Sequence, residues 1–361
     1  MRFLSLSINN FRNISSASFS TDAEDIVLTG INGQGKTNLL ECVYTLCYGS
    51  SFRTQNPKEC IKHGESGFSI NGVFLNEYSE KENVSISYID GKRKITIDGK
   101  EIKDRKELIY HFPCIVFCHE DINFIKGEPE ERRRFFDQMM SLYSPFFFDY
   151  QRQYRSVLMQ RNAAIKNGQY QLLPLYNGRL AQSGLEIMHD REETVKSFNT
   201  IFPELFSLVS QTDLKLEIEY LPSWKDFKSE DEIVSYLEEN VERDIKMSTT
   251  TSGVHRDRFI IKSQYGPFSQ IGSTGQLRLC SLILRIAQAK YFSQMSGIKP
   301  ILLIDDVLLE LDAEKRGKIL ELLDGYSQAF YTFLPNERYF SVKNDGLHYR
   351  VEGGMFTRED T

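Results

Sequence analysis

The chain has 361 residues, 40% of them hydrophobic and 26% charged, and a formal net charge of −6 at pH 7. These values are typical of a globular protein with a large core and exclude a disordered or low-complexity chain. The negative charge argues against a protein that coats nucleic acid indiscriminately, although it leaves room for a local basic surface.

No apolar run reaches the ~18 residues that a membrane helix requires, and the start of the chain alternates like a strand instead of resembling a signal peptide. We therefore expect a cytoplasmic protein without a membrane partner. The six cysteines form no CxxC pair, which predicts buried free thiols and argues against a zinc site.

Alternating and short apolar segments predict a strand-rich amino-terminal region of ~115 residues. DIVLTG is expected to be a short buried strand ending at Gly30, followed by a helix from about Gly35 to Tyr48. Further alternating segments follow, two of them joined by Asp90-Gly91, a pair typical of hairpin turns.

The pattern becomes helical and polar from Glu128 to about Ser210, with Pro129 suited to a first helical turn. A strand, DLKLEIEY, and an acidic helix from Ser229 to Lys246 complete this region. No heptad repeat lasts long enough for an extended coiled coil.

Strands and helices alternate again near the carboxyl end, with helices from Gly275 and Ala313 and strands PILLID and AFYTF. This order predicts an α/β domain assembled from both ends of the chain, with a mostly helical domain inserted. The expected parts are an amino-terminal lobe at 1–120, an inserted helical arm at 121–255 and a carboxy-terminal lobe at 256–361.

GINGQGKT, from Gly30 to Thr37, fits G-x-x-x-x-G-K-[ST] at every fixed position and lies between a predicted strand and a predicted helix. Such a P-loop turns backbone N–H groups toward phosphates, while Lys36 reaches the β- and γ-phosphates of ATP and the Thr37 hydroxyl binds Mg²⁺. The candidate ATP-binding residues here are Gly30, Asn32, Gly33, Gln34, Gly35, Lys36, Thr37 and Asn38.

A second half of this site is expected in PILLIDDVLLELD, where Asp305 and Asp306 follow an apolar strand. Asp305 would hold Mg²⁺ together with Thr37, and Asp306 would polarise the attacking water. The alternative is a strand-end turn whose carboxylates only complement a helix terminus, but the P-loop favours the catalytic interpretation. The catalytic candidates are Lys36, Asp305 and Asp306.

The segment STGQLR has two compatible interpretations. Ser273 and Gln276 have the spacing of a capping box at a helix start. The Ser273 hydroxyl and the Gly275 N–H would also form an anion site facing outward. Because Lys36 already serves this chain's own nucleotide, the second anion site would serve a nucleotide held by another copy. This arrangement is that of ABC-type ATPases, so we expect an ATP-dependent homodimer.

Several ordered segments resemble the RecF family of bacterial recombination and repair ATPases, and the similarity extends over nearly the whole chain. These segments are NFRN (10–13), GINGQGKTNLLE (30–41), GSSFRT (49–54), FCHEDINFIKGEPEERRRFFD (117–137), QRNAAIK (160–166), GVHRDRF (253–259), STGQLR (273–278) and LLIDDVLLELD (302–312).

The resemblance implies an ABC-type head related to chromosome-maintenance ATPases, with a short helical arm in place of their long coiled coil. It implies ATP-dependent dimerisation on double-stranded DNA near junctions with single strands, and cooperation with RecO and RecR in placing RecA at gaps. It also implies slow hydrolysis that acts as a release switch.

The resemblance further implies that Arg12 lies near the nucleotide and that Glu310 and Asp312 belong to a loop contacting the opposite protomer. Thr274 and Leu309 depart from the family's usual residues beside these contacts. His255, within GVHRDRF, is either a structural or a functional histidine.

Lys92, Arg93 and Lys94 in the predicted hairpin are candidate DNA phosphate contacts, because few acidic residues lie near them in the sequence. Other basic residues have solvent exposure or local ion pairing as the alternative. They are Arg132, Arg133, Arg134, Arg152, Arg155, Arg161 and Lys166.

Two rival functions are weaker. A transporter ATPase subunit would not carry the long helical insertion between Lys36 and Ser273. An ATP-gated scaffold that never hydrolyses ATP stays open, because Asp306 stands where most ABC ATPases have glutamate.

Overall fold

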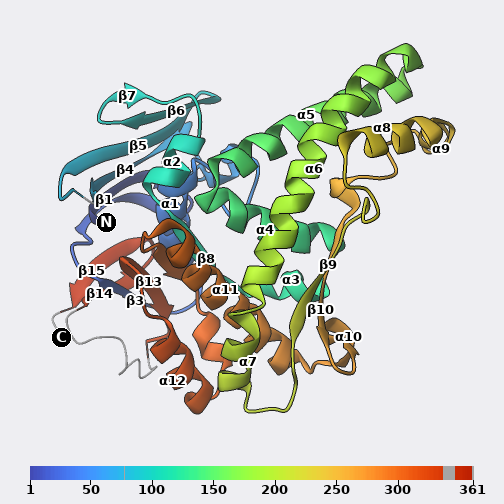
Figure 1. Cartoon of the computed structure of the whole chain (residues 1–361). Helices are drawn as coiled ribbons and strands as arrows, with labels where there is room; N and C mark the ends of the chain where they lie inside the picture. Colours follow the sequence, from blue (N-terminus) through green and yellow to red (C-terminus); the bar gives the residue numbers. More distant parts are fainter. Residues whose placement is uncertain (77, 336–345, 360–361) are drawn as a thin grey trace. The chain divides into compact units, whose positions relative to one another are not determined.

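The computed structural model describes residues 1–76, 78–335 and 346–359, apart from the side chain of Glu310. The chain forms two compact units, one made of Met1–Asp121 with Leu282–Thr361 and the other of Ile122–Ser281. The expected architecture, an α/β domain from both chain ends with a mostly helical insertion, is confirmed (Figure 1).

The carboxy-terminal boundary of the insertion differs from the expectation of 255. It lies after Ser281, because the strand that follows residue 257 pairs with a strand of the inserted unit instead of joining the α/β unit. The STGQLR segment is therefore part of the inserted unit.

A mixed sheet carries the carboxy-terminal motifs of the α/β unit. Its strand order is β15-β14-β3-β13-β12-β8, and neighbours from β14 to β8 pair in parallel. Parallel strands covered on both faces are continuous apolar runs, which is why the residues of ILLI are all buried. The strands are β3 (Asp25–Thr29), β8 (Cys114–Phe117), β12 (Ile301–Ile304), β13 (Gln328–Phe333), β14 (Leu347–Glu352) and β15 (Met355–Glu359).

An antiparallel sheet of order β2-β1-β4-β5-β6-β7 forms the other layer. The predicted hairpin is confirmed, with Asp90 and Gly91 at positive φ of 51° and 78° between β5 and β6. The strands are β1 (Arg2–Phe11), β2 (Ile14–Ser20), β4 (Gly67–Leu75), β5 (Lys81–Ile89), β6 (Lys92–Ile97) and β7 (Lys100–Glu101).

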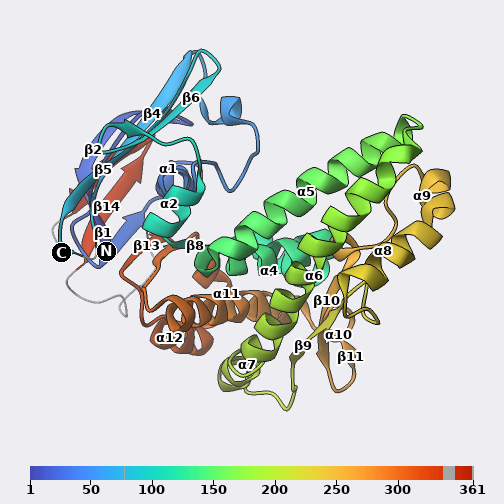
Figure 2. The ribbon, with the colours of Figure 1, turned by 45° about the horizontal axis from the view of Figure 1, so that its top comes forward.

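Helix α1 (Lys36–Tyr48) contacts strands of both sheets and shares one hydrophobic core with them (Figure 2). Its position and length confirm the predicted helix after the P-loop. All six cysteines are buried free thiols, as expected. The other helices of this unit are α2 (Lys106–His111) and α12 (Ala313–Leu322), with 3₁₀ turns at Pro57–Cys60, His119–Ile122 and Val307–Glu310.

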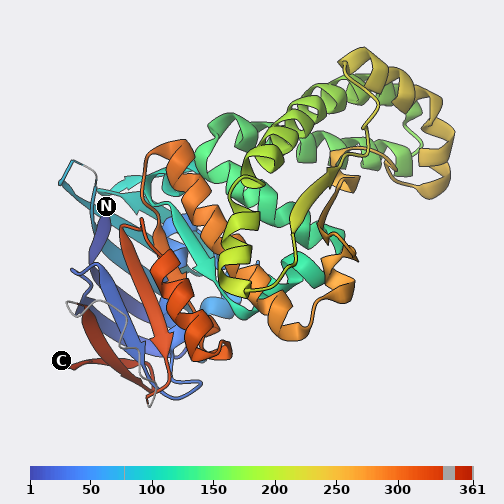
Figure 3. The same ribbon diagram turned by 60° about the horizontal axis from the view of Figure 1, so that its bottom comes forward.

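The inserted unit is built on a helical pair, α5 (Pro145–Lys166) and α6 (Leu173–Phe198), which lie side by side (Figure 3). The acidic helix expected over 229–246 is two helices, α8 (Glu230–Glu239) and α9 (Val241–Met247), and the Ser229 capping box starts the first. A small sheet of order β11-β10-β9 completes the unit.

The remaining elements of the insertion include helix α4, which begins with Pro129 in its first turn as predicted. They are α3 (Asn123–Lys126), α4 (Pro129–Tyr143), α7 (Phe202–Ser210), β9 (Glu217–Leu221), β10 (Arg258–Ser263), β11 (Gly266–Pro267) and α10 (Phe268–Ile271), with 3₁₀ turns at Tyr170–Leu172 and Val254–Arg256. Helix α11 (Thr274–Ser296) begins here and continues past the boundary at Ser281. Among the described residues, no helix combines the length and apolarity needed to cross a bilayer.

Candidate nucleotide-binding site

The P-loop lies at the carboxyl ends of parallel strands, where α/β proteins commonly bind ligands. It follows β3 directly and leads into α1. Gly33 and Gly35 have positive φ, 81° and 117°, which favours glycine. At Gly30 a Cβ atom would lie 2.5 Å from the carbonyl oxygen of Val351. The glycines of the motif are thus required by the backbone, while Asn32 is exposed at the crown of the loop.

Lys36 is held by contacts with the P-loop and with Asp306. The buried Lys36 Nζ donates to the carbonyl oxygens of Gly30 (2.7 Å) and Ile31 (3.4 Å), and it lies 3.7 Å from Asp306 Oδ2. Both carbonyls belong to the phosphate-binding loop, so the ammonium already faces the place that a phosphate would take.

Asp305 meets the P-loop as the sequence predicts. The Thr37 hydroxyl donates to Asp305 Oδ1 at 2.8 Å, across 268 positions of sequence. Burial raises the pKa of Asp305, while hydrogen bonds from Thr37 and Thr332 act in the opposite direction. A hydroxyl and a carboxylate converging at one point are the hard oxygen ligands that Mg²⁺ prefers. These residues fit a magnesium site.

The carboxy-terminal hairpin and Asn13 brace the P-loop at Gln34. The backbone N–H groups of Gly353 and Gly354 donate to the Gln34 side-chain oxygen (2.7 Å) and carbonyl oxygen (2.8 Å). Asn13 Nδ2 also donates to the Gln34 carbonyl (3.0 Å), and Asn13 Oδ1 accepts from Asn38 Nδ2 (2.8 Å). Sequence reasoning missed the hairpin, although the Gly-Gly pair near the end of the chain was a turn signal.

Arg12 is anchored to α1. Its Nε and Nη2 form a bidentate pair with the fully buried Glu41, at 3.0 and 2.7 Å. Arg53, which the sequence analysis did not name as a site residue, donates from Nη1 to both Asn38 (2.9 Å) and Glu41 (3.2 Å). A cluster of two arginines on one carboxylate thus lies beside the start of α1, with Arg53 partly exposed and bonded to Asn38, the residue that follows the P-loop.

The STGQLR segment forms the predicted capping box in the inserted unit. The Ser273 N–H donates to Gln276 Oε1 (2.9 Å), and the Gln276 N–H donates to Ser273 Oγ (3.3 Å). Ser273, Thr274 and Gly275 are exposed, and no described atom lies within 4 Å of the place a Gly275 Cβ would take. Glycine is less favourable than alanine in a helix, and the open space beside Gly275 would admit a larger side chain. Neither helix stability nor local packing therefore explains a glycine at this position.

The loop before α12 is only partly described. Asp312 caps this helix, accepting from the Lys315 N–H at 2.9 Å and pairing with Lys315 Nζ at 2.7 Å. The side chain of Glu310 lies outside the described residues.

His255 has the contacts of a structural residue. Its Nδ1 lies 2.8 Å from the Tyr154 hydroxyl and its Nε2 lies 3.1 Å from the Thr250 carbonyl oxygen. The carbonyl can only accept, so Nε2 carries the proton and Nδ1 accepts from Tyr154. Burial lowers the pKa of His255 to about 4, which keeps the ring neutral.

The basic candidates for DNA contact divide into two groups. Lys92, Arg93 and Lys94 are exposed on β6, although Arg93 Nη1 donates to the Gly49 carbonyl oxygen (2.9 Å). On the arm, Arg161 was a wrong candidate. It is fully buried and donates to Asp244 (2.6 Å), Thr250 (2.7 Å) and Asn177 (2.8 Å), because α9 and the following loop supply partners far away in sequence.

Arg132 and Arg133 are likewise engaged within the inserted unit. Arg132 Nη1 donates to the carbonyl oxygens of Ile125 and Gly127, and Arg133 Nη1 donates to that of Asp257. The geometry therefore favours contacts within the protein for these two arginines over contact with DNA.

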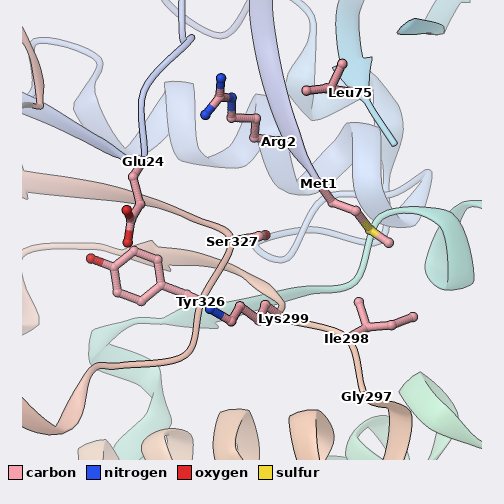
Figure 4. A pocket seen from close by; sticks show the side chains of 9 residues that line it. All are labelled: Met1, Arg2, Glu24, Leu75, Gly297, Ile298, Lys299, Tyr326 and Ser327. Carbon is pink, nitrogen blue, oxygen red and sulfur yellow. The ribbon is translucent and has the colours of Figure 1, made fainter. Parts of the chain in front are cut away.

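A surface cavity of about 530 Å³ lies elsewhere in the α/β unit (Figure 4). Glu24, Lys299 and Ser327 line it just before β3, β12 and β13 begin. The cavity is therefore at the amino ends of the parallel strands, opposite to the edge that carries Lys36 and Asp305.

Comparisons with known proteins show the family of this chain. Residues 3–344 match the family model described as the RecF/RecN/SMC N terminal domain. The DNA replication and repair protein RecF of Treponema pallidum is 38% identical over 91% of this chain and 93% of its own length. The protein of the same name from Leptospira interrogans is 33% identical over 91% and 90%.

Solved structures give the same result. The recombination mediator protein RecF with ATP, from the RecFOR pathway, superposes with a TM-score of 0.90 at 27% identity, covering 99% of this chain and 97% of that one. An Smc head bound to the C-winged helix domain of ScpA, at 13% identity and a TM-score of 0.59, shares the fold alone. The α/β unit with its P-loop and paired aspartates has the fold of an ABC-type ATPase head, and the chain belongs to the RecF family.

Proposed function

We propose that this chain is an ATP-dependent DNA-binding protein of recombinational gap repair, and that ATP acts as its switch. The observation that carries the proposal is the contact between Thr37 and Asp305 beside Lys36 and Asp306. It unites both halves of a phosphate and magnesium site in a member of the RecF family.

Each residue of this site has a distinct task. Lys36 exchanges its two backbone carbonyl partners for the β- and γ-phosphates of ATP, while the P-loop N–H groups surround those phosphates. Thr37 and Asp305 would hold Mg²⁺, which would supply positive charge next to the phosphate oxygens. Asp306 orients the attacking water and accepts its proton. Slow turnover resets the switch.

A second copy completes the site. Ser273, Gly275 and Gln276 of one protomer close over the γ-phosphate held by the other, and Glu310 and Asp312 lie in the loop that meets the partner. The exposure of Ser273, Thr274 and Gly275 at the start of α11 supports this arrangement, because the start of a helix presents N–H groups to an anion. Arg12 and Arg53 both bond Glu41 on α1, and Arg53 also bonds Asn38, the residue that follows the P-loop.

The ATP-bound dimer binds double-stranded DNA near junctions with single strands, with Lys92 and Lys94 contacting phosphates. Such binding is sensitive to salt and nearly independent of sequence. In this role the protein assists RecO and RecR in placing RecA. The name of the solved relative, a recombination mediator of the RecFOR pathway, supports these partners.

Light scattering tests the switch on Asp306→Asn, which suppresses hydrolysis. We expect Mg-ATP to double the mass and Ser273→Arg to abolish the doubling. Ser229→Arg is the matched control, because Ser229 and Glu232 form the same kind of capping box at the start of α8, outside the STGQLR segment. An unchanged mass with ATP, or equal loss of the dimer in both arginine variants, would contradict the shared site.

A non-hydrolysing scaffold is the second candidate, favoured only by aspartate at position 306. Phosphate release by the unsubstituted dimer, absent in Asp306→Asn, would exclude it.

A further inference from the structure

The buried hydroxyl of Thr332 contacts both carboxylates of the candidate catalytic pair. Thr332 stands at the end of β13, next to β12, where Ile304 pairs with Tyr331. Its Oγ1 lies 2.8 Å from Asp306 Oδ1 and 3.2 Å from Asp305 Oδ1, and the residue is only 2% exposed.

Thr332 also holds the backbone of Asp306. The Asp306 N–H donates to Thr332 Oγ1 at 2.8 Å, and Asp306 has a φ of 54°, in the left-handed region that residues other than glycine seldom adopt. This conformation turns the chain after β12, with Asp306 Oδ2 3.7 Å from Lys36 Nζ. One hydroxyl therefore fixes both the backbone and the side chain of Asp306.

The hydrogen count limits what this hydroxyl can do. A threonine hydroxyl has one proton and accepts through its oxygen. With the oxygen accepting from the Asp306 N–H, the proton goes to one carboxylate at a time, Asp306 Oδ1 at the shorter distance or Asp305 Oδ1 at the longer. When the hydroxyl donates its proton to Asp306 Oδ1, the second carboxylate oxygen, Oδ2, takes no part in this hydrogen bond and can face a water molecule.

We propose that Thr332 is a positioning residue for ATP hydrolysis, which orients the Asp306 carboxylate toward the attacking water through paired hydrogen bonds to its backbone and side chain. This inference rests on the proposed function. It adds to that function a residue outside both nucleotide-binding motifs, and it assigns Thr332 to turnover and not to ATP affinity.

Steady-state hydrolysis and ATP binding of the full chain test the inference. Thr332→Val keeps the shape of the side chain and removes the hydroxyl. We expect kcat to fall roughly 100-fold, the lower end of what a well-placed general base contributes, with the Kd for ATP changed less than about threefold. Thr332→Ser restores the hydroxyl and should recover kcat to within about fivefold of the unsubstituted protein.

Thr21→Val is the matched control. Thr21 is also fully buried and its hydroxyl donates to the Phe3 carbonyl oxygen at 2.9 Å, at the amino edge of the sheet away from the P-loop. The Thr21→Val variant also loses a buried hydrogen bond, but at a place away from the P-loop. Its kcat should therefore stay near that of the unsubstituted protein. An equal fall in Thr21→Val and Thr332→Val would show that the loss comes from general destabilisation and would overturn the inference.

Asp306→Asn separates this inference from the proposed function. If Thr332 acts through Asp306, adding Thr332→Val to Asp306→Asn should lower kcat by less than about threefold further, because coupled residues are not additive. A fully multiplied loss in the double variant would overturn the inference and leave the proposed function standing. Normal hydrolysis in Asp306→Asn alone, or none in the unsubstituted protein, would overturn both.

Discussion

Two clusters in this molecule each combine one cation with two aspartates, and they are built in opposite ways. In the inserted unit, Arg191 donates to Asp137 at 2.9–3.1 Å and to Asp257 at 2.7 Å, and Tyr220 also bonds Asp257. In the α/β unit, Lys36 Nζ lies 3.7 Å from Asp306 Oδ2 and donates hydrogen bonds to two carbonyl oxygens of the P-loop. The hydrogen-bond donors of Arg191 are all used by groups of the inserted unit, whereas Lys36 donates to backbone carbonyls that a phosphate can replace.

The difference shows how a structural ion pair is distinguished from a binding site. A buried pair with every donor used stabilises one conformation and has nothing to offer a ligand. A buried ammonium on weak neutral acceptors, next to carboxylates and hydroxyls, keeps its strongest interaction for an anion. Both clusters combine a cationic side chain with two aspartates, so charge alone does not separate them.

The largest effect should come from breaking each cluster in turn. Arg191→Met leaves Asp137 and Asp257 buried without a cation, and we expect the inserted unit to lose about 3–5 kcal/mol of unfolding free energy. Lys36→Met should change the unfolding free energy of the α/β unit by less than about 1 kcal/mol, but weaken ATP binding about 10- to 100-fold through the lost charged hydrogen bonds.

Urea denaturation measures the unfolding free energy, followed by fluorescence for the inserted unit and by circular dichroism for both units, and equilibrium dialysis with ATP measures the binding. Trp224 is the chain's single tryptophan and is buried in the inserted unit, so its fluorescence reports on that unit. Equal destabilisation by both substitutions would remove the distinction between the clusters.

A smaller effect is expected from His255 in the inserted unit. Its folded pKa of about 4 lies below the ordinary 6.5, so the unfolded chain binds a proton first as the pH falls. Stability is therefore complete above pH 6.5 and is lost progressively down to about pH 4. Between pH 7 and pH 5 the contribution of His255 should fall by about 2 kcal/mol.

His255→Gln provides the comparison, because glutamine does not titrate and its amide can still donate to the Thr250 carbonyl. Urea midpoints from Trp224 fluorescence should shift less with pH in the variant than in the unsubstituted protein. Identical pH dependence in the two proteins would show that His255 is accessible enough to be protonated in the folded state.

The sequence revealed those parts of the site that one continuous segment encodes. GINGQGKT needs glycines for backbone angles and close approach, and LLIDD needs an apolar strand before its aspartates, so the residues alone are enough to locate both. Their contact through Thr37 and Asp305 followed from the motif chemistry. Even the capping box at Ser273 was a local pattern of four residues.

What could not be predicted depends on partners far away in sequence. Arg161 looked like a basic surface residue on a polar helix, yet Asp244 and Thr250 bury it. The strands of the carboxy-terminal hairpin mix charged and apolar residues because β15 is an edge strand, so no clear alternation marked them. Thr332 stands in an apolar run, and only the pairing of β13 with β12 brings its hydroxyl to Asp305 and Asp306.

The smallest effect concerns the lysines of β6, which are exposed and, among the residues that the structure describes, form no ion pair of the kind seen in the two clusters. Lys92 and Lys94 alternate on the strand, whereas the intervening Arg93 is bonded to the Gly49 carbonyl. Lys92→Gln with Lys94→Gln should weaken double-stranded DNA binding uniformly across sequences. For each protomer of the dimer, the slope of log K against log salt should become shallower by roughly 1.8, since each of the two phosphate contacts contributes about 0.9.

Fluorescence anisotropy with two DNA duplexes of unrelated sequence, over a series of salt concentrations, measures both quantities. Lys225→Gln with Lys228→Gln is the control, because it makes the same change in net charge at two exposed lysines of the inserted unit. If the control lowers the slope as much as the β6 variant, then net charge and not the hairpin governs binding. If only the β6 variant does so, the hairpin lysines contact phosphate although the chain as a whole is negative, because a local surface, not the total charge, meets the DNA.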